Sequence, residues 1–360
     1  MYDAIVIGAR CAGAATAMLL ARKGLDVLLV DRARFPSDIP HGHFIHRHGP
    51  RRLHDWGLLD RVLATNCPRV TQFTSDMGDF PLTGTELAAG DVPLGLGPRR
   101  TALDAVLIEA AVDAGAEFRE GCPVRELRSD GERVTGIDGE PADLVIGADG
   151  RNSHVAKQVH APVTYEKPAI SVWYFSYWGG VPEPGISVHV RDRTAVFAFP
   201  TNDDLFAVFI AWPLTELARV KRDIEAAMLE VIAATPRLGE RILAGTREER
   251  LYGATQLPNF VRQAHGPGWA LVGDAGVHKD PFMALGVCDA LRDAELLADC
   301  IDDLPEYERR RNEATLQDFD LNFGAAHLMA PPEMLAMRQT LRDDQAATNR
   351  FYREREGIPG

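Results

Sequence analysis

The sequence predicts an α/β fold, in which a three-layer, Rossmann-like dinucleotide-binding domain carries an inserted antiparallel β-sheet domain and a C-terminal helical tail. Three glycine-containing motifs lead to this prediction, at residues 8–13, 147–150 and 273–276. Each motif follows a short apolar run that is typical of a buried strand. A strand, a tight glycine turn and a helix N-terminus together form the usual binding place of a dinucleotide pyrophosphate.

The first motif has the spacing of a dinucleotide-binding fingerprint. The apolar run 4–7 leads into the residues GARCAG at 8–13, and a stretch of small residues then indicates a helix. A second apolar run, 27–30, ends in Asp31, which lies 18 residues after Gly13. The carboxylate that holds an adenosine ribose is expected roughly 20 residues after the glycine turn. Asp31 is therefore the candidate ribose ligand, the alternative being a surface carboxylate that caps a turn.

Hydrophobic periodicity predicts the remaining elements. Alternating aromatic-rich runs at 170–178 and 206–212 indicate antiparallel strands, and the turn at 129–132 indicates a hairpin. Helices are expected at 103–114, 214–234 (ended by Pro236) and 290–301, and the tail from Pro305 reads as mostly helical.

We expect a discontinuous domain organisation. The dinucleotide-binding domain is predicted from residues 1–70, 98–165 and 265–304, the substrate-binding domain from 71–97 and 166–264, and a C-terminal helical segment from 305–360.

Composition narrows the classes of function. The apolar fraction of 46% and the charged fraction of 25% are ordinary for a soluble globular protein. A net charge of −13 disfavours nucleic acids and acidic membranes as partners. Five scattered cysteines favour free thiols in a reducing cytoplasm over a disulfide framework or a zinc site. We expect no signal peptide, because the first strand begins at Tyr2, and no membrane-spanning segment.

The order of the three motifs resembles the single-component (class A) FAD-dependent aromatic hydroxylases and monooxygenases, whose wider superfamily includes flavin halogenases and geranylgeranyl-reductase-like proteins. The resemblance covers the chain from Met1 to about Asp302 and implies FAD as the cofactor. It places Asp149 and Gly150 against the flavin, Asp274 on the ribityl chain, and Arg100 at a helix start that contacts the cofactor. The residues assigned to FAD are Gly8, Arg10, Cys11, Ala12, Gly13, Asp31, Arg32, Arg100, Asp149, Gly150, Gly273, Asp274, Pro281, Gly286 and Val287.

Two positions depart from the family pattern. Arg10 stands where a glycine normally lets the backbone approach the pyrophosphate. We expect its guanidinium to point towards the phosphates or solvent rather than to block the site. Met283 stands where a small residue is common, which predicts a bulkier loop beside the isoalloxazine ring.

A histidine-rich stretch from His41 to His48 follows the second strand. By resemblance this segment passes the flavin edge, so His43 and His46 are the catalytic candidates, with an acid or base role near pH 7. A loop of surface and capping histidines is the alternative, and we expect no metal site. The residues expected to contact the substrate are Phe44, Trp173, Phe175, Tyr177, Phe199, Trp212 and Met283.

The resemblance implies an FAD-dependent monooxygenase that oxygenates an aromatic or polyketide-like molecule with O2 through a flavin C4a-hydroperoxide. NAD(P)H would bind transiently as the donor, or a partner would reduce the flavin; the oligomeric state, a homodimer included, stays open. The alternatives are a reductase of a prenyl or polyene chain and a non-enzymatic flavin-binding protein. A flavin halogenase is disfavoured, because no lysine lies between Lys23 and Lys157 and no WxWxIP motif occurs.

Overall fold

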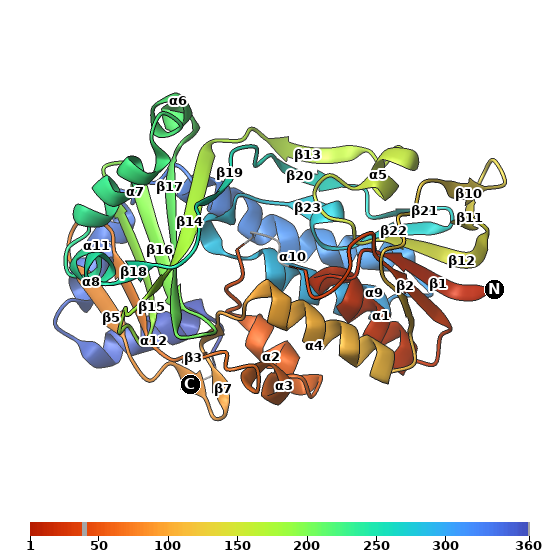
Figure 1. The fold of residues 1–360 in the computed structure, drawn as a ribbon, viewed down its shortest axis with the longest axis horizontal. Helices are drawn as coiled ribbons and strands as arrows, with labels where there is room; N and C mark the ends of the chain where they lie inside the picture. Colours follow the sequence, from red (N-terminus) through yellow and green to blue (C-terminus); the bar gives the residue numbers. More distant parts are fainter. Residues whose placement is uncertain (38–41, 359–360) are drawn as a thin grey trace.

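Two large sheets organise the chain. The structure, a computed structural model, describes residues 1–37 and 42–358 (Figure 1). A mostly parallel sheet lies at the right of the view, near the N-terminus, and a mostly antiparallel sheet lies at the left. The predicted α/β class with a Rossmann-type domain is confirmed. His41 lies outside the described residues.

The mostly parallel sheet begins from short apolar runs that are buried on both faces, as parallel strands require. Its parallel part has the order β9 (Glu117–Arg119), β2 (Val27–Val30), β1 (Tyr2–Ile7), β12 (Glu140–Gly147) and β22 (Trp269–Leu271). The antiparallel strands β10 (Leu127–Ser129), β11 (Val134–Ile137) and β21 (His265–Gly266) extend it. The hairpin predicted at 129–132 joins β10 to β11 and is confirmed.

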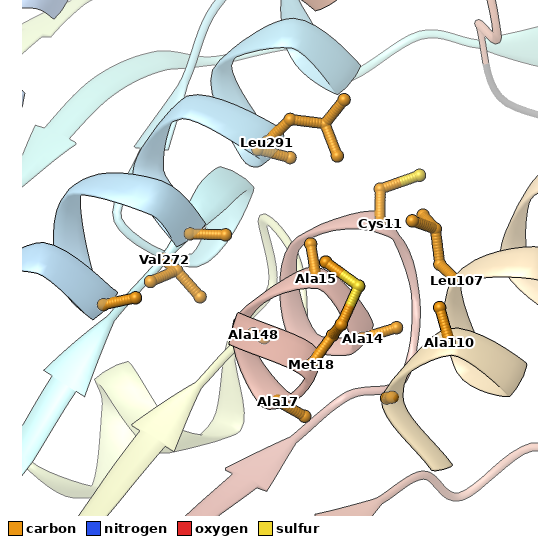
Figure 2. Packing of buried hydrophobic residues seen from close by; sticks show 14 of the residues in the cluster. Cys11, Ala14, Ala15, Ala17, Met18, Leu107, Ala110, Ala148, Val272 and Leu291 are labelled. Carbon is orange, nitrogen blue, oxygen red and sulfur yellow. The ribbon is translucent and has the colours of Figure 1, made fainter. Parts of the chain in front are cut away.

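Three helices pack closely because one of them carries small side chains. α1 (Cys11–Arg22) contacts both α4 (Arg100–Asp113) and α9 (Gly286–Asp299). Figure 2 shows the alanines of α1 facing leucines of the other two helices, which brings the first and third motifs together. The labelled residues of this core include Cys11, Ala14, Ala15, Ala17, Met18, Leu107, Ala110 and Leu291.

Shorter elements lie outside the two large sheets and the three packed helices. They are α2 (His48–Asp55), α3 (Leu59–Leu63), α5 (His154–Gln158), η2 (Gly273–Ala275) and η3 (Pro281–Met283), the small sheet β13 (Val163–Lys167), β20 (Asn259–Arg262) and β23 (Val277–His278), and the strand pairs β3 (Arg69–Val70) with β8 (Gly95–Leu96) and β6 (Ala88–Ala89) with β7 (Val92–Pro93).

The second sheet has two different faces, because successive side chains of a strand alternate. Trp173, Phe175 and Tyr177 belong to one apolar cluster, and Tyr174 and Trp178 belong to the cluster on the other face. The strand order is β18 (Thr246–Arg247), β14 (Ser171–Gly179), β17 (Leu205–Pro213), β16 (Thr194–Pro200), β15 (Ile186–Arg191), β4 (Phe73–Asp76) and β5 (Pro81–Gly84), with β19 (Tyr252–Ala254) also paired to β14.

The helix predicted at 214–234 is wrong as a single element. The structure has η1 (Leu214–Glu216), α6 (Leu217–Val220) and α7 (Ile224–Ala233), and α8 (Leu238–Ala244) follows Pro236. Asp223 starts a new helix, because its side chain accepts a hydrogen bond from the backbone N–H of Ala226 at 2.9 Å. The helix predicted at 103–114 begins three residues earlier, at Arg100.

The C-terminal segment is helical, as predicted. It consists of α10 (Leu304–Ala325), α11 (Pro332–Leu341) and α12 (Gln345–Arg355). α10 contacts α9 and η3, whereas α12 packs on β5 of the second sheet. The segment therefore touches both halves of the molecule (Figure 1). Within residues 1–37 and 42–358, no helix combines the length and apolar character that a membrane crossing requires.

Candidate functional site

The first motif forms a cradle that side chains would fill. Gly8 follows β1 with a φ of 105°, in the region that favours glycine. A Cβ on Gly8 would lie 2.5 Å from the carbonyl oxygen of Ala148, and one on Gly13 would lie 1.7 Å from the carbonyl oxygen of Gly8. No side chain in the described part of the protein caps the first turn of α1, around Cys11 and Ala12. This arrangement suits the binding of a pyrophosphate.

The Arg10 side chain is bound by protein groups rather than directed to solvent. Its Nη1 donates to Oδ2 of Asp104 at 2.7 Å and to the carbonyl oxygen of Ser37 at 3.3 Å. Its Nη2 donates to Oγ of Ser37 at 3.1 Å. The guanidinium pairs with a buried carboxylate on α4, so the expectation that it points to solvent is wrong, while a contact with the phosphates stays a prediction.

Asp31 stands directly after β2, at the position expected of the ribose carboxylate. Its Oδ2 accepts from the backbone N–H of Ala9 and its Oδ1 from that of Ala33, each at 2.7 Å. Each carboxylate oxygen keeps a further lone pair for a ribose hydroxyl. Through Ala9, the side chain of Asp31 also fixes the glycine turn. The neighbouring Arg32 is exposed.

The middle motif differs in its details from the expectation. Gly150 has a φ of 79° and no atom within 4 Å of an added Cβ, which leaves the turn open. Asp149 accepts from Oγ of Ser153 at 2.5 Å and from the backbone N–H of His154 at 2.6 Å. Its carboxylate therefore holds the start of α5, so a flavin contact by Asp149 stays a prediction.

The late motif lies beside the first motif and carries a carboxylate. Gly273 has a φ of 57°, and a Cβ on it would lie 2.8 Å from that of Ala12 in α1. Asp274 follows in η2 and has no hydrogen-bond partner among the described residues. Burial raises the pKa of Asp274, against the opposing charges of His278 and Arg100. A desolvated carboxylate without a partner fits a hydroxyl-rich ligand such as a ribityl chain.

Asp274→Ala is expected to weaken FAD retention. The change removes one acceptor that contributes on the order of 1 kcal/mol, which corresponds to a roughly fivefold higher dissociation constant. FAD titration of the apoprotein, followed by flavin fluorescence, measures it. Asp302→Ala, at an exposed carboxylate, is the matched control and should bind FAD as the parent does. Equal affinity for both variants would show that Asp274 does not contact the cofactor.

A buried charge cluster links α4 to the glycine turn, and the sequence prediction missed its central residue. Asp104 is 0% exposed and accepts from Nε of Arg100 at 3.2 Å and from its Nη2 at 2.9 Å, besides pairing with Arg10. Two guanidiniums therefore share one carboxylate, which leaves a net positive charge beside the cradle. The i,i+4 spacing of Arg100 and Asp104 on a helix was the signal that could have found it.

Cys11 also borders this cluster. Its Sγ lies 3.5 Å from Oδ1 of Asp104, and burial raises the pKa of this thiol to about 12. The thiol therefore stays protonated at neutral pH.

His43 is enclosed by aromatic rings. Its Nε2 lies 3.0 Å from the hydroxyl oxygen of Tyr177, and its ring centroid lies 5.0 Å from that of Phe199 in an edge-to-face contact. Burial and the nearby charges of Arg99 and Arg100 lower the pKa of His43 to about 3. The imidazole is therefore neutral near pH 7, and the expectation that it titrates there is corrected; contact with substrate stays a prediction.

His46 has both ring nitrogens engaged. Nδ1 lies 2.6 Å from Oε2 of Glu356, and Nε2 lies 2.9 Å from the carbonyl oxygen of Met283. No ring nitrogen is left for proton transfer to a substrate, so the geometry favours a positioning role over the catalytic one. The sequence prediction missed Glu356, which lies far along the chain.

The predicted substrate residues mostly gather in one aromatic cluster. Phe44, Trp173, Phe175, Tyr177 and Phe199 all belong to it. Phe282 of η3 meets Trp173 edge-on, with centroids 6.5 Å apart, and Met283 follows it in the same turn. Trp212 is the correction: β14–β17 pairing puts it opposite Val172, on the face that packs against α7 and α8.

The remaining predicted cofactor residues lie where the third motif meets α9. Pro281 begins η3, Gly286 begins α9 and is exposed, and Val287 is buried in the first turn. The start of α9 therefore adjoins the same loop as Met283.

No group of three or more His, Cys, Asp or Glu side chains in residues 1–37 and 42–358 is placed to hold a metal ion. All five cysteines carry free thiols.

Two relatives match most of this chain in sequence. A tryptophan 2-halogenase of Chondromyces crocatus is 26% identical over 318 residues, which cover 82% of this chain and 60% of the halogenase. This chain therefore spans less than two thirds of that relative. A menaquinone reductase of Mycolicibacterium smegmatis is 27% identical over 323 residues, covering 82% of this chain and 75% of the reductase.

Solved structures share the architecture over nearly the whole chain. The flavin-dependent brominase Bmp2 superposes with a TM-score of 0.81 at 19% identity, covering 99% of this chain and 93% of the brominase. PqsL of Pseudomonas aeruginosa, described as a probable FAD-dependent monooxygenase, gives 0.76 at 18% identity, covering 98% and 99%.

The sequence match and the cradle agree on the cofactor. A pattern defined for the FAD binding domain matches residues 1–303. The glycine cradle, the uncapped helix start and the carboxylate of Asp274 are the features that fit FAD. FAD is therefore the cofactor of this chain. The chain belongs to the FAD binding domain family.

Proposed function

We propose that this protein is an FAD-dependent monooxygenase that oxygenates an aromatic or polyketide-like small molecule, with O2 as oxidant and NAD(P)H as electron donor. One observation carries the proposal. The aromatic face of the second sheet, with Tyr177 and Phe199, lies against the loop of His43 and the loop of Phe282. These loops adjoin the motifs assigned to FAD, so the aromatic face would close the far side of the flavin.

The chain's own residues would bind the substrate, orient it and exclude water from it. Stacked rings such as Phe175 and Phe209, with centroids 4.3 Å apart, offer a flat apolar wall for a planar substrate. The neutral ring of His43 and the hydroxyl of Tyr177 add polar groups that could orient it. FAD would supply the electron transfer and oxygen chemistry when bound, while apolar surroundings would limit side reactions.

Relatives of this chain suggest two reactions other than oxygenation. Menaquinone reductases support a reduction, and a tryptophan halogenase and a brominase support halogenation. The first third of this chain has no lysine after Lys23, where the resemblance expects the lysine that relays hypohalous acid. Oxygenation is favoured because PqsL, which spans the same length, has been solved with the aromatic 2-aminobenzoylacetate.

A coupled assay separates these reactions. The FAD-loaded protein is incubated with NADH or NADPH and a panel of phenols, aminobenzoyl compounds, quinones and polyenes. An oxygenase should consume NAD(P)H and O2 in equal amounts and give a product heavier by one oxygen atom. A reduced product formed without O2 would replace the proposal by a reductase, and a product that requires chloride or bromide would replace it by a halogenase.

His43→Ala is expected to lower turnover about 10- to 100-fold with FAD still bound, because the substrate loses a wall that positions it. His189→Ala is the matched control: His189 is also buried with a lowered pKa, but it lies on β15 outside the aromatic face. Steady-state turnover and flavin absorbance are compared for both variants. Equal turnover in the two variants would show that the substrate does not bind beside His43.

A further inference from the structure

The main chain of Met283 is held at both of its polar groups. Its N–H donates to Oδ1 of Asn322 at 3.0 Å, and its carbonyl oxygen lies 2.9 Å from Nε2 of His46. Nδ2 of Asn322 also donates to the carbonyl oxygen of Asp280 at 2.8 Å, so one buried amide spans the whole turn. The next residue, Ala284, has a φ of 52°, a left-handed conformation that is unfavourable for alanine. The turn therefore depends on outside contacts for its shape.

The protonation of His46 follows from its partners. A carbonyl oxygen only accepts hydrogen bonds, so Nε2 carries the hydrogen that it directs at Met283, and an ionised Glu356 requires a second hydrogen on Nδ1. His46 is 6% exposed and Glu356 is 1% exposed. With Glu356 ionised, the pair is a buried imidazolium and carboxylate, in which each charge needs the other.

The surroundings of Glu356 support its charge. His46, Arg355 and Arg47 lower the pKa of Glu356 to about 2, although burial alone would raise it. Nε of Arg355 lies 3.6 Å from Oε1 of Glu356, and Arg47 is itself paired with Asp318 at 2.7 Å.

Two more groups border the pair from other elements. The Cys288 thiol of α9 donates to the carbonyl oxygen of His46 at 3.2 Å, and its pKa is raised to about 11 by burial, so it is neutral. The ring of His48 adjoins Gly357, and burial lowers the pKa of His48, so it adds no charge at neutral pH.

The end of the chain is anchored well enough to place Glu356. The Tyr352 hydroxyl lies 2.7 Å from Oγ of Ser75 and donates to the carbonyl oxygen of Leu82 at 2.9 Å. Arg338 of α11 is 2% exposed and binds both carboxylate oxygens of Asp79. These contacts fix α11 and α12 to the strands β4 and β5 before the chain reaches Glu356.

We infer that Glu356 is a positioning residue of the active site, which acts through the imidazolium of His46 to fix the Met283 turn. Asn322 holds the same turn from α10, so both clamps come from the segment after residue 303, where the match to the FAD binding domain ends. The inference rests on the proposed function in one respect, namely that this turn faces the flavin. The C-terminal segment thereby completes a site that the cofactor domain alone would leave loose.

The first measurement needs no substitution. In FAD-loaded protein labelled with 15N-histidine, the His46 signals, assigned by comparison with His46→Gln, should show both ring nitrogens protonated at pH 7. Glu356→Gln should remove this signature, since a neutral amide does not support the imidazolium. A His46 ring with a single protonated nitrogen in the parent protein overturns the inference, whatever the variants do.

The second measurement tests the coupling to the flavin. Glu356→Gln should keep FAD, shift the visible flavin spectrum in a way that depends on pH between 5 and 8, and lower kcat about tenfold with little change in KM. A histidine without a carboxylate partner changes charge in that range. Glu354→Gln is the matched control, since Glu354 is exposed on the same helix. His46→Gln should give the same loss as Glu356→Gln, and the double variant should add nothing.

These outcomes separate the inference from the proposed function. If no substrate is oxygenated but the histidine signature and the pH-dependent flavin spectrum appear, the inference stands and the proposed reaction fails. If oxygenation is found but Glu356→Gln matches Glu354→Gln in spectrum and kcat, Glu356 is only structural and the inference fails. Should Glu356→Gln not fold, Glu356→Asp, which keeps the charge but shortens the reach, gives the same comparison through its partial loss.

Discussion

Gly13→Ala is expected to release FAD and to lower the free energy of unfolding by about 3 kcal/mol, the upper end of the usual cost of overpacking. The added Cβ would lie 1.7 Å from the carbonyl oxygen of Gly8 and 3.0 Å from the Cβ of Ala148. The backbone fixes the position of a Cβ, so no side-chain rotation can relieve this clash and the start of α1 must move away from β1. That movement would also pull α1 from α4 and α9, because the three helices pack through small side chains.

The measurements are the flavin content of the purified protein and urea denaturation. Gly324→Ala is the control, since Gly324 lies in α10 and an added Cβ has no atom within 4 Å. Alanine at a helix position without a clash should stabilise by roughly 0.5–1 kcal/mol. A Gly13→Ala protein that is yellow and as stable as the control would show that the close approach of α1 is not what binds FAD.

Local signals made the backbone turns of the candidate cofactor site predictable. The turn at Gly8 and Gly13, the carboxylate at Asp31 and the motif at Gly273 each depend on a few neighbouring residues. Strand parity was also readable: within the alternating run 206–212, Trp212 is six residues after Phe206 and therefore shares its face, whereas Phe209 lies on the other face. The error was to assign Trp212 to the substrate wall by residue type, when its register with Val172 puts it on the other face.

Contacts between distant residues could not be predicted. Arg10 and Asp104 are 94 positions apart, and His46 and Glu356 are 310 apart. Only the three-dimensional packing of α1 on α4, and of α12 near the histidine loop, decides these partners. The charge of a side chain shows that it needs a partner when buried, but not which one it finds.

The same limit explains the two histidines. The ordinary pKa of an imidazole made His43 and His46 natural acid–base candidates. Their environments decide otherwise, because His43 is surrounded by rings and cationic side chains, and His46 is held between Glu356 and a backbone carbonyl. Burial and hydrogen-bond partners are properties of the fold, so a functional role based on residue type alone was not secure.

Asp104→Asn is expected to lower the free energy of unfolding by about 3–5 kcal/mol, the cost of removing one partner from a buried ion pair. Asp104 is 0% exposed, and the side chains of Arg10 and Arg100 are only 18% and 10% exposed. Asparagine keeps the size of the side chain but removes its charge, so both guanidiniums would lose their counter-ion. Urea denaturation of the FAD-free protein measures this effect without the cofactor phosphates, which could otherwise replace the lost charge.

Three further variants isolate the cause of that loss. Asp113→Asn, on the exposed end of the same helix, breaks the surface pair with Arg61 at 2.8 Å and should cost less than about 1 kcal/mol. Arg10→Gly alone should leave FAD bound with a modest change, because Asp104 keeps Arg100. Combined with Asp104→Asn, it should recover part of the lost stability, since one unpaired guanidinium is removed. If Asp104→Asn costs no more than Asp113→Asn, the two arginines are solvated well enough alone, and Asp104 is not what holds Arg10 in place.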